Sequence, residues 1–243
     1  MKKGLNAYQI KIIAMFAMVL DHLAHIVILM PISQNAALSI ATAMNVIGRI
    51  TMPIMCFFIA QGYYHTTNLK RYFIRLFVFA IISQVPYYLY DVQYIHTNLW
   101  DFIKYNVFHL NVIYTLFMGL LALTIAKSNI NIILKAIGVV FAVYATYYSD
   151  WRLYGVIWVL IFGVFYGNFT KQMVAFLTVA IIRCYMYHAG NVYSFALQLC
   201  TLLAIPVLYL YNGERGRKSK YGFYIFYPLH LLILGIIKIF MIS

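Results

Sequence analysis

The sequence predicts an all-α polytopic membrane protein, a bundle of about nine transmembrane helices. Of its 243 residues, 65% are hydrophobic and only 9% are charged, and the apolar residues form long runs separated by short polar loops. Soluble domains are about half apolar and about a quarter charged. A water-soluble fold could not bury this much apolar surface, whereas repeated long apolar runs are typical of proteins that cross a bilayer several times.

The individual helices follow from the length of the apolar runs, because a helix needs about 20 residues to cross the hydrocarbon core. Two of the runs are short, so we expect between about eight and ten helices. Because the loops are short, we expect one domain over residues 1–243. The first run is too long for a signal peptide and lacks a small-residue cleavage site, which indicates a retained helix. The predicted spans are residues 8–30, 38–63, 72–90, 106–126, 130–148, 151–167, 172–188, 191–211 and 221–241.

The net charge of +13 comes from 18 Lys and Arg against 5 Asp and Glu. In a soluble protein this balance would suggest nucleic acid as a partner. Here the basic residues lie between the spans, so they indicate topology and contact with anionic lipid of the bilayer, and no nucleic acid is expected. Lys2, Lys3 and Lys11 predict a cytoplasmic N-terminus by the positive-inside rule. The three cysteines lie in apolar runs without metal-ligand spacing, so we expect free thiols and no metal.

A small set of ionisable side chains lies inside the predicted spans, where each charge costs at least about 2.5–3.5 kcal/mol. Such groups are functional candidates by default. By these boundaries, His22, Arg49 and His230 lie between the membrane midplane and its outer third. The set is Asp21, His22 and His25 in the first span, Arg49 in the second, Arg183 in the seventh and His230 in the ninth.

Asp21 and His22 are adjacent and point about 100° apart on a helix, so we expect Asp21 to pair with Arg49. His22 is then the candidate general base, because the pKa of histidine lies near the working pH. His25 is a weaker candidate nearer the outer surface. The alternative is structural: the ion pair and the histidines serve helix packing alone.

A second group of basic residues, Lys70, Arg71 and Arg75, lies on the expected cytoplasmic side. Arg71 and Arg75 are four residues apart and share a helical face, where guanidinium groups bind phosphates bidentately. Together with Lys11 they are predicted to form a phosphate-binding entrance. The alternative is a group that only sets topology. The run "NGERGRKSKY" is interpreted as a solvated inside loop.

Several stretches resemble the TraX family of membrane proteins, which is known for N-terminal acetylation of conjugative pilin. They occur in the family's order and cover most of the chain. The most specific are the N-terminal "DH", the "GRxxxP" and the final "FYPLH". The resembling stretches are "GLNAYQIKIIAMFAMVLDHLAHIV", "IGRITMPIMCFFIAQGYYHTTNLKRYFIRLFVFAIISQVPY", "NVIYTLFMGLLAL", "YSDWRLYGVIWVLIFG" and "KYGFYIFYPLHLLIL".

The family is distantly similar to a wider group of transmembrane acyltransferases, which includes the acyltransferase-3 proteins. Those proteins carry a basic residue about ten positions before a first-helix histidine, as Lys11 precedes His22. They also carry an arginine pair after an early helix, which Arg71 and Arg75 resemble although their spacing differs by one residue.

The resemblance implies an acyltransferase of the bacterial cytoplasmic membrane that takes acetyl from acetyl-CoA. The acceptor would be a secreted or membrane-anchored peptide or a surface glycan. His22 would be the base, with His230 or Arg49 stabilising the oxyanion and Asp21 holding Arg49. The alternatives are a proton-coupled transporter or flippase with Asp21, His22 and His230 as a relay, and an accessory membrane subunit. The residues expected to line the acceptor side are Asn111, Tyr227, Asp150 and Arg152.

Overall fold

The computed structural model describes residues 4–91, 109–188, 190–218 and 221–242. In these residues the regular structure is helical, apart from one isolated bridge between Leu5 and Tyr211. Six apolar helical segments are long enough to cross a membrane, and three further apolar helices are shorter. The long segments are Ala7–Val27, Gln34–His65, Leu69–Asp91, Phe169–Met186, Val192–Tyr209 and Gly222–Met241, and the shorter ones are Val112–Lys127, Ile132–Tyr144 and Arg152–Val164.

These nine segments follow the nine predicted spans in order, so the predicted fold class is confirmed. Lys2 and Lys3, used for the orientation, lie outside the described residues, as does the start of the predicted span 106–126. The helices are α1 (Ala7–Val27), α2 (Gln34–Gly48), α3 (Thr51–His65), α4 (Leu69–Asp91), α6 (Val112–Lys127), α7 (Ile132–Tyr144), α8 (Arg152–Val164), α9 (Phe169–His188), α10 (Val192–Leu199), η1 (Cys200–Leu203), α11 (Ala204–Tyr209) and α12 (Gly222–Ile242).

The chain divides into two compact units, each assembled from segments distant in sequence. The first unit contains Met1–Met55, Leu177–Phe226 and Ile236–Ser243. The second contains Cys56–Phe176 and Tyr227–Gly235. Helices α3, α9 and α12 therefore each supply residues to both units. This division into compact units does not decide the number of domains, so the expectation of a single domain stays a prediction.

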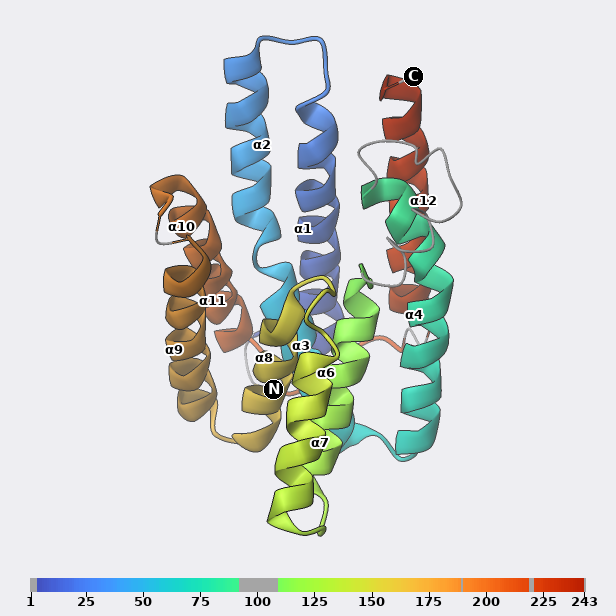
Figure 1. Cartoon of the computed structure of the whole chain (residues 1–243), viewed down its shortest axis with the longest axis vertical. Coiled ribbons are helices and arrows are strands. Elements are labelled where there is room, and N and C mark those ends of the chain that lie inside the picture. Colours follow the sequence, from blue (N-terminus) through green and yellow to red (C-terminus); the bar gives the residue numbers. More distant parts are fainter. Residues whose placement is uncertain (1–3, 92–108, 189, 219–220, 243) are drawn as a thin grey trace. The chain divides into compact units, whose positions relative to one another are not determined.

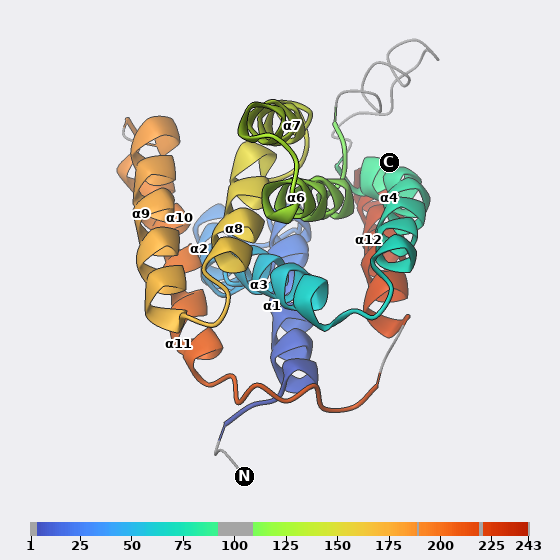
Figure 2. The same ribbon diagram turned by 90° about the horizontal axis from the view of Figure 1, so that it is seen from below.

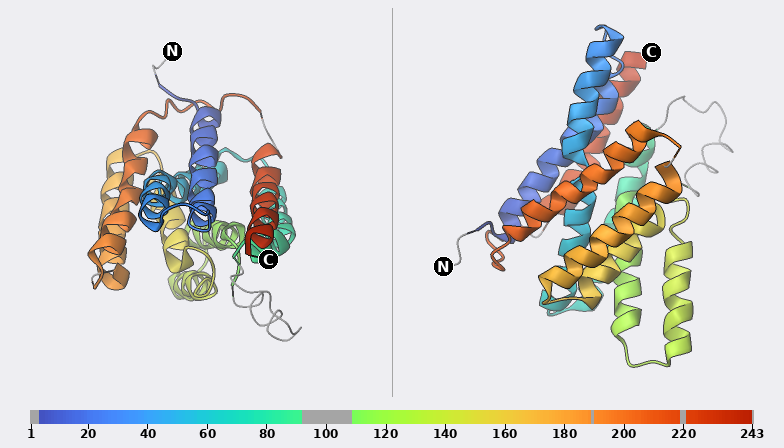
Figure 3. Two further views of the ribbon diagram at one scale, coloured as in Figure 1. Left: turned by 90° about the horizontal axis from the view of Figure 1, so that it is seen from above. Right: turned by 90° about the vertical axis from the view of Figure 1, so that its left-hand side faces the viewer.

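In the first unit, α1 and α2 lie side by side along their length (Figure 1). The part of α9 after Leu177 is followed by α10 and α11, which turn back and run beside it (Figure 3, right). Arg183 on α9 donates to the Gln198 side chain at 2.6 Å, which joins this pair of segments. Thr42 on α2 and Tyr193 on α10 share a hydroxyl hydrogen bond of 2.6 Å.

The second predicted span is two helices rather than one, because the chain turns at Arg49 and Ile50 between α2 and α3. Pro53 gives the physical reason. It has no N–H to donate to the carbonyl of Arg49 four residues earlier, and its ring crowds that carbonyl, so an uninterrupted helix is disfavoured there. Thr51 donates its hydroxyl to the carbonyl of Ala14 at 3.1 Å, which holds the turn against α1.

The run predicted as a solvated loop is an irregular segment with residues 213–218 exposed, as predicted, and its backbone also pairs with the start of α1. The backbone N–H groups of Ala7 and Tyr8 donate to the carbonyls of Glu214 and Arg215 at 2.8 and 3.2 Å. These N–H groups belong to the first turn of α1, where no carbonyl of the helix itself can accept them. The carbonyl of Leu5 also accepts from Asn212 at 2.9 Å.

In the second unit, α6 lies between α8 and α4, and α7 packs along α6 and α8 (Figure 2). Small residues allow α6 and α8 to approach closely, as is common between membrane helices. A Cβ added to Gly119 on α6 would lie 2.8 Å from Val159 on α8, and one added to Gly163 on α8 would collide with Leu123 on α6. The side chains of Trp158 on α8 and Phe176 on α9 complete this core, with ring centroids 5.2 Å apart.

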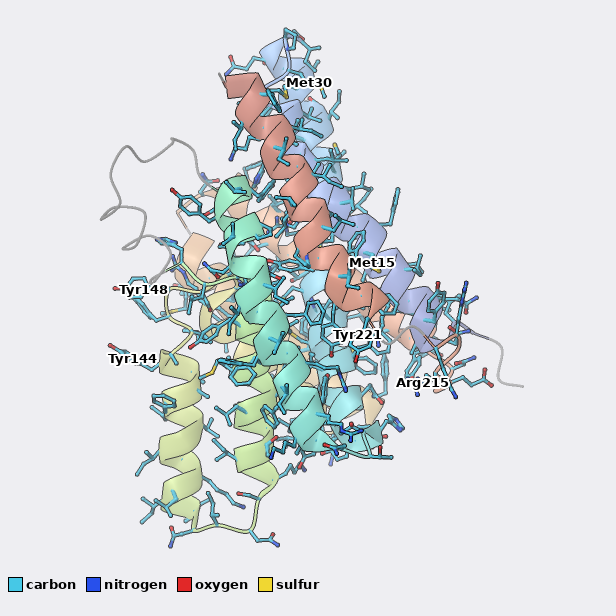
Figure 4. All side chains as sticks on the ribbon, turned by 90° about the vertical axis from the view of Figure 1, so that its right-hand side faces the viewer. Met15, Met30, Tyr144, Tyr148, Arg215 and Tyr221 are labelled. Carbon is cyan, nitrogen blue, oxygen red and sulfur yellow. The ribbon has the colours of Figure 1, made fainter. Side chains whose placement is uncertain are left out.

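The outer face of α7 is strongly apolar and exposed, from Ile132 (74% exposed) to Phe141 (61%). Tyr144 and Tyr148 project outward at its end (Figure 4). Apolar side chains followed by tyrosines suit contact with lipid tails and then with the headgroup region.

Candidate functional site

The predicted ion pair between Asp21 and Arg49 is present in the first unit. Nη2 of Arg49 donates to Oδ1 of Asp21 at 2.6 Å, and the side chains are 15% and 20% exposed respectively. At this depth a charged hydrogen bond contributes more than an exposed pair, because little water competes for either partner.

The sequence around Arg49 makes room for this pair. A Cβ added to Gly48 would collide with the side chain of Asp21, so only glycine lets α1 and α2 approach at this level. Gly48 ends α2 and Arg49 follows at the turn, which directs the guanidinium toward α1. In the GRxxxP pattern, Gly48 therefore allows the two helices to approach closely and Arg49 supplies the positive charge. Pro53 favours the turn.

The candidate base, His22, is half-buried on α1, and His25 is exposed. His230 is buried in the second unit, 7% exposed, with its ring 5.6 Å from that of Tyr227. Because His22 and His230 belong to different units, their meeting at one reaction centre stays a prediction. Lys238 on α12, which the sequence pattern did not single out, is only 8% exposed although it carries an ammonium group.

Lys11 has a basic neighbour that the sequence did not indicate. Its Nζ lies 5.4 Å from the ring centroid of Phe223, and that ring packs edge-on against Tyr8. The docking of residues 212–216 on α1 places Arg215 where its charge acts on Lys11 (Figure 4 marks Arg215). Both residues belong to the first unit, so these two cations form one basic site.

The other predicted phosphate-binding residues stand at the start of α4 in the second unit. Lys70 and Arg71 are exposed, and Arg75 is half-buried with its guanidinium 5.7 Å from the ring of Tyr72. The Nε of Arg75 is buried and has no hydrogen-bond partner among the described residues. Asn68 caps the helix by accepting from the N–H of Arg71 at 2.8 Å. That these arginines and Lys11 form one phosphate-binding entrance stays a prediction.

Asn111, predicted to line the acceptor side, caps α6 and ties it to α4. Its Oδ1 accepts from the N–H groups of Ile113 and Tyr114 at 3.0 and 3.4 Å. Its Nδ2 donates to the carbonyl of Ala80 at 2.7 Å and to Oε1 of Gln84 at 2.8 Å. An amide has two donor and two acceptor positions, and all four are used. The structure thus gives Asn111 a structural role, and contact with an acceptor stays a prediction.

Asp150 and Arg152 lie in the turn that leads into α8. The N–H of Asp150 donates to the carbonyl of Leu110 at 2.8 Å, and the hydroxyl of Thr115 donates to the carbonyl of Asp150 at 2.6 Å. Trp151 and Arg152 have φ angles of 61° and 48°. Two successive non-glycine residues in the left-handed region store strain, and such strain is common at functional sites.

Tyr227 is buried, 5% exposed, and its oxygen forms a hydrogen bond with the backbone of Val112 at the start of α6. It interacts electrostatically with Asp150 and Asp91, and contact of Tyr227 or Asp150 with an acceptor stays a prediction. Tyr87 also interacts electrostatically with these two carboxylates. Tyr87 and Asp91 were missed in the sequence analysis, although their spacing of four on a helix was the available signal.

The fold and these sites define a multi-pass α-helical membrane protein with ionisable groups on its spanning helices. The family model described as TraX protein matches residues 6–238, and the chain belongs to the TraX family. It is 32% identical over 248 residues to a probable fimbrial assembly protein FimC, serogroup H1, of Dichelobacter nodosus, with 97% of each chain covered. No solved structure matches the chain. The resemblance seen in the sequence is therefore confirmed.

Proposed function

We propose that this protein is a membrane acetyltransferase that takes acetyl from cytoplasmic acetyl-CoA. Membership of the TraX family over residues 6–238 carries the proposal, because that family is associated with pilin acetylation. A relative named for fimbrial assembly supports a pilin-like peptide as the acceptor. The acceptor group is then a peptide N-terminal amine, with a glycan hydroxyl at the outer face as the alternative.

Acetyl-CoA supplies an acetyl group activated as a thioester. The acceptor nitrogen forms a bond to the carbonyl carbon, the carbon–sulfur bond breaks, and the sulfur leaves as a thiol after gaining a proton. His22 takes the proton that the acceptor loses, and Arg49, in the same unit, stabilises the charge on the carbonyl oxygen. Asp21 fixes Arg49 through the 2.6 Å ion pair.

The coenzyme A phosphates would bind basic side chains. In the first unit Lys11 and Arg215 form such a group. In the second unit Lys70, Arg71 and Arg75 form another, and guanidinium groups suit phosphate because they donate two parallel hydrogen bonds. The orphan Nε of Arg75 supports this assignment, since a buried donor costs free energy until a ligand accepts from it.

The test is transfer of labelled acetyl from acetyl-CoA by the purified protein to a short peptide with a free N-terminus. His22→Ala should lower the rate about 10²–10⁴-fold, as is typical for loss of a general base. His25→Ala is the matched control, because His25 is exposed three residues further along the same helix, and it should retain the rate. Full activity of His22→Ala with every acceptor tried would show that this mechanism is wrong.

A further inference from the structure

Three neighbouring helices of the second unit are too short to cross a bilayer of ordinary thickness. We define the short-helix layer as α6, α7 and α8, which pack on one another (Figure 2). They contain 16, 13 and 13 residues. At a rise of about 1.5 Å per residue they are about 24, 20 and 20 Å long, whereas the hydrocarbon core of a bilayer is about 30 Å thick. The layer is therefore about 6–10 Å shorter than that core.

The three helices meet at one common level, which we call the rim of the layer. The N–H of Asp150, just before α8, donates to the carbonyl of Leu110, just before α6, at 2.8 Å. The hydroxyl of Tyr114, in the first turn of α6, donates to the carbonyl of Ala145, just after α7, at 3.4 Å. Because the helices share this level, their shortness gives one thin layer rather than a staggered one.

Helix α4 continues past this rim. Nδ2 of Asn111 donates to the carbonyl of Ala80 and to Oε1 of Gln84 at 2.7 and 2.8 Å, so the start of α6 lies beside this part of α4. α4 ends only at Asp91, about 10 Å further along the helix. Val85, the first residue of this projecting part, is apolar and 57% exposed. Exposed apolar surface on α4 therefore extends to a level that α7 does not reach.

The two ends of α7 carry side chains that suit the surfaces of a bilayer. Between them, residues 132–141 are apolar apart from Lys135, and their outward face is exposed. Tyr144 and Tyr148 follow at the rim, where they project outward (Figure 4). The opposite end begins at the exposed Asn131, which caps the helix. Tyrosines are enriched at the membrane surface and lysines reach toward it, whereas an amide is costly in hydrocarbon.

A flat bilayer cannot place both ends of α7 at its surfaces. These ends are about 20 Å apart, so in a hydrocarbon core of about 30 Å at least one of them would lie about 5 Å or more below the surface. A bilayer adapts to a short apolar segment by becoming thinner around it. A second copy of the chain could also cover the face, but the tyrosines at its end favour lipid headgroups.

We propose that the bilayer is thinned locally around α7, so that lipid headgroups contact both Asn131 and Tyr144, while it keeps its ordinary thickness beside α4. This contact with lipid goes beyond the proposed function and does not depend on it. Within that function, a thinner bilayer shortens the path between cytoplasmic acetyl-CoA and an acceptor at the outer face.

The experiment attaches a nitroxide spin label to one introduced cysteine at a time, in the full-length protein reconstituted in dioleoyl phosphatidylcholine vesicles. Electron paramagnetic resonance then measures contact of the label with oxygen, which dissolves in hydrocarbon, and with a polar nickel chelate, which stays in water. The background is Cys200→Ala, because Cys56 and Cys184 are fully buried. This background without an introduced cysteine is the control and should take up no label.

Labels on Asn131→Cys and Tyr144→Cys should both contact the chelate. Their ratio of chelate contact to oxygen contact should be at least about tenfold higher than that of Ile137→Cys in the middle of α7, because a polar solute is excluded from hydrocarbon. Val85→Cys is the matched position on α4 and should resemble Ile137→Cys. If loss of the cap in Asn131→Cys lowers the Tm, Asn129→Cys in the exposed turn before α7 replaces it.

Predominant oxygen contact at either end of α7 would overturn the inference, because that end would then lie in hydrocarbon. Chelate contact at Val85→Cys would overturn the local character of the thinning. Spin–spin broadening with loss of oxygen contact at Ile137→Cys would show a second copy of the chain on this face instead of lipid. No acetyl-CoA is used, so a protein that transfers no acetyl can still confirm the thinning, and the reverse also holds.

Discussion

The ion pair between Asp21 and Arg49 is expected to stabilise the first unit, and Asp21→Asn tests this. The substitution keeps the shape of the side chain and removes its charge, which leaves Arg49 charged and 85% buried, since that side chain is 15% exposed. A hydrogen bond to a charged group contributes about 1.5–3 kcal/mol, and breaking a fully buried pair costs about 3–5 kcal/mol. Because both side chains retain some exposure, we expect a loss of about 2–3 kcal/mol.

The assay is thermal unfolding of the purified protein in a mild detergent, followed by circular dichroism. For a chain of this length a loss of about 2–3 kcal/mol corresponds to a Tm lower by about 5–10 °C. Arg49→Gln and the double variant complete a double-mutant cycle. The control is Glu214→Gln, whose exposed carboxylate accepts from Asn212 at 3.3 Å, and which should change stability by less than about 0.5 kcal/mol.

The decisive quantity is the coupling free energy between Asp21 and Arg49 rather than the loss of stability in either single variant. The double variant should be more stable than the sum of the single losses predicts, by about 1.5–3 kcal/mol. Additive losses, within about 0.5 kcal/mol, would refute the conclusion that the contact stabilises the fold.

Three further predictions follow from single residues. Asn111→Ala should lower stability by about 2–3 kcal/mol in the same assay, because it removes a helix cap and two hydrogen bonds to α4; unchanged stability with weaker acceptor binding would instead make Asn111 a substrate residue. Gly48→Ala should cost about 1–3 kcal/mol by forcing Asp21 out of place, whereas Gly190→Ala, which has open space around it, should be neutral. Arg152→Gly should raise stability by about 0.5–1 kcal/mol by relieving the left-handed strain, and a simultaneous fall in acetyl transfer would indicate that Arg152 contacts the acceptor.

Much of the fold was predictable because it depends on local properties of the chain. Apolar runs of the right length give helices in any membrane protein, so nine segments could be placed in order without any contact information. The partnership of Asp21 with Arg49 was also predictable, because two opposite charges within apolar runs have few other ways to be stabilised. The division of the second span at Arg49 was missed, since hydropathy does not register the effect of Pro53 on a backbone hydrogen bond.

The candidate sites were less predictable. Arg215 belongs to a run whose composition indicated a solvated loop, and only its docking on the first turn of α1 joins it to Lys11. Asn111 was expected at a binding surface because it is polar within an apolar region. Its actual partners on α4 are about 30 residues earlier in the chain, and no periodicity in the sequence points to them.

By itself the sequence determined the helices, their order, the charged residues that must be stabilised inside the membrane, and the TraX family. These follow from hydropathy and short motifs, which are properties of neighbouring residues. The tertiary structure alone decided that residues 212–216 dock on the start of α1, and that Asn111 joins α6 to α4. These contacts depend on which surfaces of distant segments pack together, and close approaches such as those at Gly119 and Gly163 between α6 and α8 follow from no local pattern of the sequence.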